Sequence, residues 1–305
     1  MRKGIVVLFL IIPWAWQPVF AVSIVAWGDN TYGQCDVPAG EDFVSIASGT
    51  YYGLGLKVDG SLVAWGKNDY GQLDVPAVDK FLDFACGYQH ALAIKDNGSL
   101  VAWGDNMFGQ CDVPTGNDYA GVAGGQDHSV ALKSDGSLVA WGLNYHGQCD
   151  VPSGNDFIDV VAGYQHSLAL KSDGSLAAWG YNFEGQCDVP SGNDFVDIAA
   201  SSMHSLALKS DGSLVQWGWL SSYYDAPVGN DFIAIACGYN HRLALKSNGS
   251  VVAWGVNFEG QCNVPTRYDF VDISAYGLHS FGLVPEPSTI LFLGLGGLTL
   301  LRNRS

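Results

Sequence analysis

Short apolar runs alternate with turn residues along most of the chain, and no stretch shows the 3.6-residue spacing of an amphipathic helix. The segment LALKSDGSLVQWG (206–218) has two strand-like runs on either side of Asp-Gly, and near copies occur at 130–142 and 168–180. Asp-Gly between such runs is a strong hairpin signal. A further run, such as NDFVDIAA (193–200), precedes each hairpin. Each unit therefore predicts three short strands.

The unit recurs at an almost constant spacing. Trp-Gly pairs are 38 residues apart five times and then 37, at Trp27, Trp65, Trp103, Trp141, Trp179, Trp217 and Trp254. A histidine series agrees, at His90, His128, His166, His204, His241 and His279, with Tyr52 in the first place. Seven units result. Because a three-stranded sheet cannot bury both faces alone, the units must pack on one another.

The two ends of the repeat region favour a ring over a solenoid. The region begins with SIVAWG (23–28), the second arm of a hairpin, and ends with HSFGLV (279–284), a first arm. Pairing Ile24–Trp27 with Ser280–Val284 would remove two exposed edges, whereas a solenoid would need polar caps. We therefore predict an all-β fold: a seven-bladed β-propeller over residues 23–284, with about three main strands per blade.

The segments outside the repeats predict export. Arg2 and Lys3 precede an apolar run and small residues near Ala21, which indicates a signal peptide at residues 1–21. An uncleaved N-terminal anchor is the alternative. At the other end, residues 285–305 contain prolines, the apolar run ILFLGLGGLTLL (290–301) and a basic tip. This order is typical of a membrane stop with its positive end inside.

Removing both ends makes the chain more acidic. Four basic residues and one acidic residue leave with them, so the formal net charge changes from −16 to −19. Such a surface repels phosphate backbones, which argues against nucleic acid as a partner.

Two resemblances follow from these motifs. CGYQHALAIKDNGSLVAWG (86–104) resembles the repeat of the regulator of chromosome condensation family, and the short period with the GQCDVP linker is still more similar to secreted bacterial β-lactamase-inhibitory propellers. The C-terminus resembles a PEP-CTERM sorting signal of Gram-negative-type bacteria. That resemblance implies processing by an exosortase, transient membrane contact, and delivery to the cell surface, outer membrane or extracellular matrix. The sorting residues would be Pro285, Glu286, Pro287, Arg302 and Arg304.

Repeated polar residues are more easily explained by structure than by chemistry. Ring symmetry holds equivalent histidines apart, whereas zinc needs three or four converging ligands, so we expect buried hydrogen-bonding histidines and no metal. Five of the seven cysteines share one linker position, and we expect mostly unpaired thiols, with linker disulfides as the alternative. Aspartates in SDG and GND are turn and strand-start residues.

No motif for catalysis or for a cofactor is present. The acidic residues that break the repeat, such as Asp127 and Glu184, form no acid–base pair, and the chain lacks a nucleophile elbow, a phosphate loop and a dinucleotide fingerprint. We therefore expect no enzyme activity and no cofactor.

Positions that vary between units mark candidate partner-binding loops. One set precedes each histidine and the other follows each Trp-Gly pair; tyrosine beside polar residues is typical of recognition surfaces. The predicted partner-binding residues are Tyr51, Tyr88, Gln89, Gln126, Asp127, Tyr164, Gln165, Met203, Tyr239 and Asn240, together with Trp219, Tyr223 and Tyr224 of the atypical sixth unit. In the inhibitory propellers, aromatics at matching loops contact the partner. For the phenylalanines after Trp-Gly we expect packing between blades instead.

These patterns favour an exported, non-catalytic binding module for a protein or polysaccharide. The alternatives are a structural matrix component without a discrete ligand and an inhibitor of a secreted enzyme. Nucleotide exchange on a small GTPase, which the nuclear members of the resembled family imply, is disfavoured by the export signals and the acidic charge.

Overall fold

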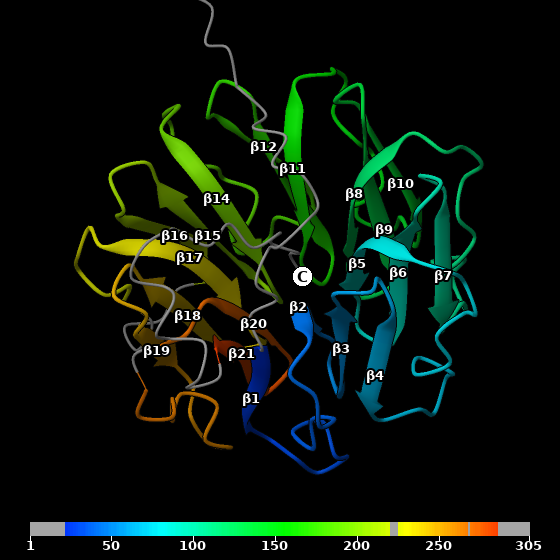
Figure 1. Ribbon diagram of the computed structural model, residues 1–305. Coiled ribbons are helices and arrows are strands. Elements are labelled where there is room, and N and C mark those ends of the chain that lie inside the picture. The colour runs from blue at the N-terminus through cyan, green and yellow to red at the C-terminus, as the bar shows by residue number, and fades with distance from the viewer. Residues whose placement is uncertain (1–21, 220–224, 268, 286–305) are drawn as a thin grey trace, which may run out of the picture.

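The computed structural model describes residues 22–219, 225–267 and 269–285, and all its regular elements are strands. They form seven antiparallel sheets of three strands each, arranged around a common centre (Figure 1). The predicted all-β, seven-bladed propeller is therefore confirmed. No described segment is a helix of the length and apolarity needed to cross a membrane.

Every blade has the same strand order. The inner strands, which contact the inner strands of the neighbouring blades, are β2 (Phe43–Ser48), β5 (Phe81–Cys86), β8 (Tyr119–Gly124), β11 (Phe157–Ala162), β14 (Phe195–Ala200), β17 (Phe232–Cys237) and β20 (Asp272–Tyr276). The middle strands are β3 (Tyr52–Lys57), β6 (His90–Lys95), β9 (His128–Lys133), β12 (His166–Lys171), β15 (His204–Lys209), β18 (His241–Lys246) and β21 (His279–Pro285). The outer strands are β1 (Val22–Gly28), β4 (Leu62–Gly66), β7 (Leu100–Gly104), β10 (Leu138–Gly142), β13 (Leu176–Gly180), β16 (Leu214–Gly218) and β19 (Val251–Gly255).

The two ends of the repeat region close the ring. Strand β1 pairs antiparallel with β21 in continuous register from Val22 opposite Pro285 to Gly28 opposite His279. The inner strand of the same blade, β20, in turn contacts β2 of the first blade. The predicted pairing of Ile24–Trp27 with Ser280–Val284 is confirmed, and it covers the edge of β21 that would otherwise be exposed.

The hydrophobic core lies between blades. At the seam between the first two blades, Leu54 and Leu56 pack with Phe81, Phe84 and Trp103. A comparable cluster occupies the closing seam, where Ile24, Leu283 and Phe281 meet Phe43 and Trp65. Each blade thus buries its faces against its neighbours, as the repeat predicts.

Each Trp-Gly pair holds a seam together. The indole Nε1–H of Trp65 donates to the backbone oxygen of Gln34 in the preceding linker at 2.9 Å, and Trp103 donates likewise to Gln72 at 3.0 Å. The glycine that follows Trp65, Gly66, has φ of +103°, and a Cβ there would lie 2.5 Å from the Tyr51 oxygen. Only glycine fits this position without strain.

The sixth unit lacks the usual linker, and its seam differs accordingly. Trp254 donates instead to the side-chain Oε1 of Gln216, at 3.3 Å.

Candidate functional site

The strand directions divide the loops between two faces. The end of each outer strand lies beside the start of the middle strand, as where Gly66 of β4 pairs with Tyr52 of β3. The loops that leave the inner strands and those that leave the outer strands therefore begin on the same face of the ring. We call it the tyrosine face. The Asp-Gly turns lie on the opposite face, the turn face. Val22 and Pro285, the first and last residues of their strands, pair at the turn-face end of the closing blade.

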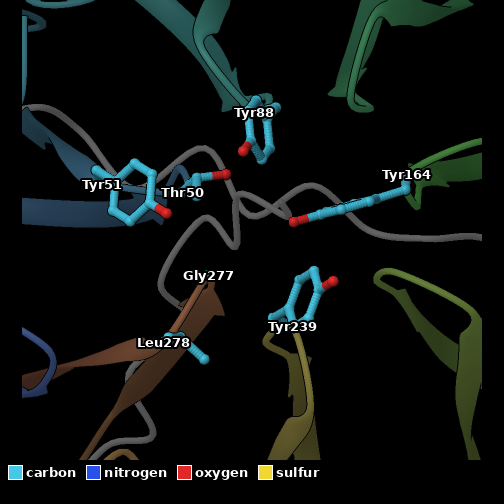
Figure 2. A pocket seen from close by; sticks show the side chains of 7 residues that line it. All are labelled: Thr50, Tyr51, Tyr88, Tyr164, Tyr239, Gly277 and Leu278. Atoms are coloured by element: carbon cyan, nitrogen blue, oxygen red, sulfur yellow. The ribbon is translucent and has the colours of Figure 1, made fainter. Parts of the chain in front are cut away.

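A pocket of about 170 Å³ opens on the tyrosine face near the centre of the ring. Figure 2 shows four tyrosine rings from four different blades around it. The lining residues are Thr50, Tyr51, Tyr88, Tyr164, Tyr239, Gly277 and Leu278. The structure thus brings the four predicted tyrosines together, although 188 residues separate the first from the last.

Tyr164 is the central ring of this cluster. Its centroid lies 5.7 Å from that of Tyr88, nearly perpendicular at 86°, and 5.3 Å from that of Tyr239 at 59°. It also lies 6.1 Å from Tyr276, which is fully buried. Burial, followed by the hydroxyls of Tyr276, Tyr88 and Tyr239, raises the pKa of Tyr164 far above its usual value. Tyr164 is therefore uncharged at neutral pH.

Two buried hydroxyls belong to this region. Thr50 Oγ1 and the Tyr276 hydroxyl have no hydrogen-bond partner among the described residues, and the two side chains are 5% and 0% exposed. In Figure 2 the Thr50 oxygen points into the pocket. A buried hydroxyl without a partner costs free energy, so Thr50 offers a bond that a ligand would satisfy.

Charged groups surround the pocket without lining it. Asp127 is half-buried; burial first, and then Asp105, raises its pKa. Lys67 lies over the rings of Tyr32 and Tyr51, at 4.6 and 5.5 Å from their centroids, and its Nζ is 2.8 Å from Asp69. Among the described residues, none of those that line the pocket is charged.

The remaining predicted partner-binding residues lie on the tyrosine face outside the pocket lining. They are Gln89, Gln126, Asp127, Gln165, Met203 and Asn240 in loops before the histidines, and Trp219 after the outer strand β16. Met203 is exposed, and its backbone oxygen accepts a hydrogen bond from Trp219 N. Tyr223 and Tyr224 lie outside the described residues.

Sequence reasoning missed Thr50 and Tyr276. A signal for Tyr276 was present, because it stands three residues before His279, where five other units have glycine and one has Ser201.

The expectation that the phenylalanines after Trp-Gly pack between blades is wrong: Phe183 and Phe258 are 81% and 90% exposed, because their loops extend into solvent beyond the seam.

The six repeated histidines are buried, and four of them make the predicted hydrogen bond, to a serine of the next blade: His90, His128, His166 and His241. His128 Nε2 is 2.9 Å from Ser167 Oγ of the next blade, and Ser167 donates to the Gln148 oxygen. The serine hydrogen is thus used, so the histidine donates to Ser167 Oγ. Burial lowers the pKa of His128 to about 3, which keeps the ring neutral. No group of three His, Cys, Asp or Glu side chains suited to a metal ion occurs in the described parts.

The cysteines are all free thiols, which confirms the preferred prediction. Cys35 Sγ lies 3.2 Å from the Asp29 oxygen, and its backbone N–H donates to Asn30 Oδ1. Burial and then Asp29 raise the pKa of Cys35 to about 12. The linker cysteine thus fills a small site inside its own loop.

The sequence matches the family described as Regulator of chromosome condensation (RCC1) repeat over residues 43–72, 81–110, 120–148, 157–186 and 232–261. RCC1 repeats therefore extend across most of the chain. Residues 283–305 of this RCC1-repeat chain also match the PEP-CTERM protein-sorting motif, which indicates export in Gram-negative-type bacteria. Signals of this kind are exosortase substrates. Of the predicted sorting residues, only Pro285 is described. The N-terminal signal peptide stays a prediction.

Solved structures show the same fold. Prp20p from Saccharomyces cerevisiae is 21% identical, with a TM-score of 0.72 over 88% of this chain and 92% of its own. Human WBSCR16 is 18% identical, with a TM-score of 0.73 over 88% and 100%. The ectodomain of the Arabidopsis thaliana receptor kinase ACR4 is 23% identical, with a TM-score of 0.67 over 78% and 89%. No curated protein sequence matches the chain. The closer resemblance to β-lactamase-inhibitory propellers stays a prediction.

Proposed function

We propose that this RCC1-repeat chain is an exported, non-catalytic binding propeller of the bacterial cell surface or extracellular matrix. It recognises a protein or polysaccharide through the loops of the tyrosine face. The family match and the sorting motif support export and interaction as the general role, because propellers of this kind usually serve as interaction domains.

The pocket is the observation that carries the site assignment. The loops before the histidines are equivalent in the repeat, yet four of them present tyrosine to one central pocket. Packing alone would not require this, since the seams are held by the tryptophans, histidines and core leucines. Tyrosine combines a large apolar face with a hydroxyl, which suits a recognition surface.

The orientation of the chain supports the same assignment. Pro285, which begins the sorting segment, lies at the turn-face end of β21, whereas the pocket lies at the other end of the ring. A chain held at its C-terminus would present the tyrosine face away from the attachment point.

The binding activities of the structurally similar proteins are not assigned to this chain. Prp20p has reported binding properties to Gsp1p and histones, but at 21% identity the likeness supports only the fold. Export also separates this chain from such partners.

The test is capture of partners from an extracellular matrix extract. We expect the protein to retain specific components, and Tyr88→Ala with Tyr164→Ala to abolish their retention. The matched control is Tyr145→Ala with Phe183→Ala, which removes two rings that are 80% and 81% exposed on outer loops of the same face. Equal capture by both double variants would refute the site, and would favour a structural role without a discrete ligand.

A further inference from the structure

We propose that the pocket on the tyrosine face takes a cationic side chain, a lysine ammonium or an arginine guanidinium, presented by a partner protein. This inference rests on the proposed binding function and specifies the chemistry of its ligand. It chooses a protein over a polysaccharide as the partner.

The arrangement of the rings is the first support. Tyr88, Tyr164 and Tyr239 approach the pocket from three blades, with interplanar angles of 86° and 59° between neighbours. A group placed among them meets the Tyr88 and Tyr239 rings and the Tyr164 hydroxyl, which points toward the pocket in Figure 2. The face of an aromatic ring carries negative potential and attracts a cation, by about 0.5–2 kcal/mol depending on how far water is excluded.

The structure contains an internal example of this contact. The Lys67 ammonium lies over the rings of Tyr32 and Tyr51 at the edge of the same region. Asp69, 2.8 Å from Lys67 Nζ, offsets its charge. Tyr51 is therefore engaged by a cation of the chain itself, and the proposed ligand would contact the other three pocket tyrosines.

The Thr50 hydroxyl is an independent sign of a polar ligand. Thr50 is 5% exposed, lines the pocket, and has no partner for Oγ1 among the described residues. An ammonium group has three N–H donors and no acceptor, so it would donate to Thr50 Oγ1 while its remaining surface contacts the rings. A purely apolar ligand would leave that hydroxyl unsatisfied.

The electrostatic setting favours a positive ligand. The chain has a formal net charge of −16, and the Asp127 carboxyl is close enough to the pocket to influence both Tyr88 and the underlying Tyr276. Within the described parts of the chain, no Lys or Arg lines the pocket. The negative charge of the protein attracts basic segments of a partner, and the uncharged, ring-lined pocket has room for one cationic side chain.

The size of the pocket limits the ligand. At about 170 Å³ it is smaller than the roughly 300–1,000 Å³ of sites that enclose a drug-sized molecule. One side chain fits such a volume, whereas a chain of sugar rings would need an extended groove. The partner would therefore insert one residue and make its other contacts on the surrounding loops.

The experiment uses the exported protein labelled with ¹³C at its tyrosine rings. It is titrated with a capped Gly-Lys-Gly peptide and with the same peptide carrying norleucine, which keeps the apolar stem and lacks the charge. We expect the lysine peptide to move the ring signals of Tyr88, Tyr164 and Tyr239, and the norleucine peptide to bind about 3- to 30-fold more weakly.

Three variants assign the effect. Tyr164→Leu should abolish the shifts, Tyr164→Phe should keep affinity within about threefold because it retains the ring, and Tyr145→Leu should change nothing. Thermal unfolding of each variant verifies that it is folded. Equal binding of the two peptides, or shifts that persist in Tyr164→Leu, would overturn the inference.

The outcomes also separate this inference from the proposed function. If neutral oligosaccharides move the same tyrosine signals and lysine does not, the cationic ligand is refuted and the tyrosine face remains a binding site. If neither probe binds and capture from matrix extract is unaffected by Tyr88→Ala with Tyr164→Ala, both proposals fail.

Discussion

The Trp27 indole donates to the backbone oxygen of Gln261, 2.9 Å away in space and 234 residues away in sequence. The same bond joins Trp103 to Gln72 across an internal seam, at 3.0 Å. The seam between the β17–β19 blade and the blade that β1 completes is therefore built like the others, although its two sides come from opposite ends of the chain.

Trp27→Phe and Trp103→Phe should destabilise the protein to a similar degree. Each removes one buried N–H donor to a linker oxygen, and the loss of such a hydrogen bond costs about 1–3 kcal/mol of unfolding free energy. Urea unfolding followed by circular dichroism measures both. A clear loss for Trp103→Phe with none for Trp27→Phe would show that β1 is not docked in solution and that the ring is open.

Acid should destabilise the propeller through its histidines. Burial lowers the pKa of His128 to about 3 and that of His166 to about 4, against 6.5 in the unfolded chain. Between these values the unfolded chain binds more protons, so the histidine contribution to the free energy of unfolding is constant above pH 6.5 and falls as the pH drops toward 3. Each such histidine contributes about 1.4 kcal/mol per pH unit within that window.

Asp83 opposes this trend. Burial raises its pKa to about 7 from 3.8, so its contribution to stability is lost as pH rises through that range. The contribution of the six buried histidines is larger than that of Asp83.

Urea unfolding of His128→Gln from pH 4 to pH 7 should show a shallower pH dependence than the parent. His146→Gln, on an exposed loop, is the control and should leave the slope unchanged.

The thiols should react slowly in the folded protein. Burial raises the pKa of Cys111 and Cys187 to about 12, so at pH 8 few thiolates are present to attack a disulfide reagent. All seven cysteines should become titratable on unfolding without a reductant. Fewer than seven would reveal disulfides and contradict the arrangement of the linkers.

The two faces should behave differently when the protein is immobilised. Biotin attached next to Pro285 leaves the tyrosine face open, so capture of matrix components should be retained. Biotin at Met107→Cys, on an exposed loop of the tyrosine face, should reduce capture, because that face would then meet the support. Equal capture from both orientations would contradict the assignment of binding to this face.

The repeat predicted most of the fold. The spacing of the Trp-Gly pairs gave seven units, Asp-Gly placed the hairpins, and the incomplete first and last arms predicted ring closure. These features depend on local turn chemistry and on period, which a single sequence contains. The structural role of the histidines followed from the same symmetry, because equivalent side chains are held apart around a ring.

The pocket was harder to predict. The four tyrosines could be selected because they occupy variable loops, but their distance from one another depends on how far each loop leans toward the centre. In the sequence, Thr50 is indistinguishable from other loop residues. That its hydroxyl has no hydrogen-bond partner can be recognised only from the three-dimensional positions of the surrounding groups. Phe183 and Phe258 were misassigned because hydrophobicity alone does not distinguish a seam from an exposed loop tip.

Ring closure underlies both faces and the pocket, so a cross-link across the junction tests the account most directly. Ser23 and Val284 lie opposite each other in the β1–β21 register. Cα atoms of opposite residues in antiparallel strands are about 4.5–5.5 Å apart, within the range of a disulfide. Ser23→Cys with Val284→Cys should form a disulfide in the folded protein, identified by mass spectrometry of the linked peptides, whereas Ser23→Cys with Ser213→Cys should not. Failure of the first pair to link while the protein remains folded would mean that the blades form an open spiral and that the account is wrong.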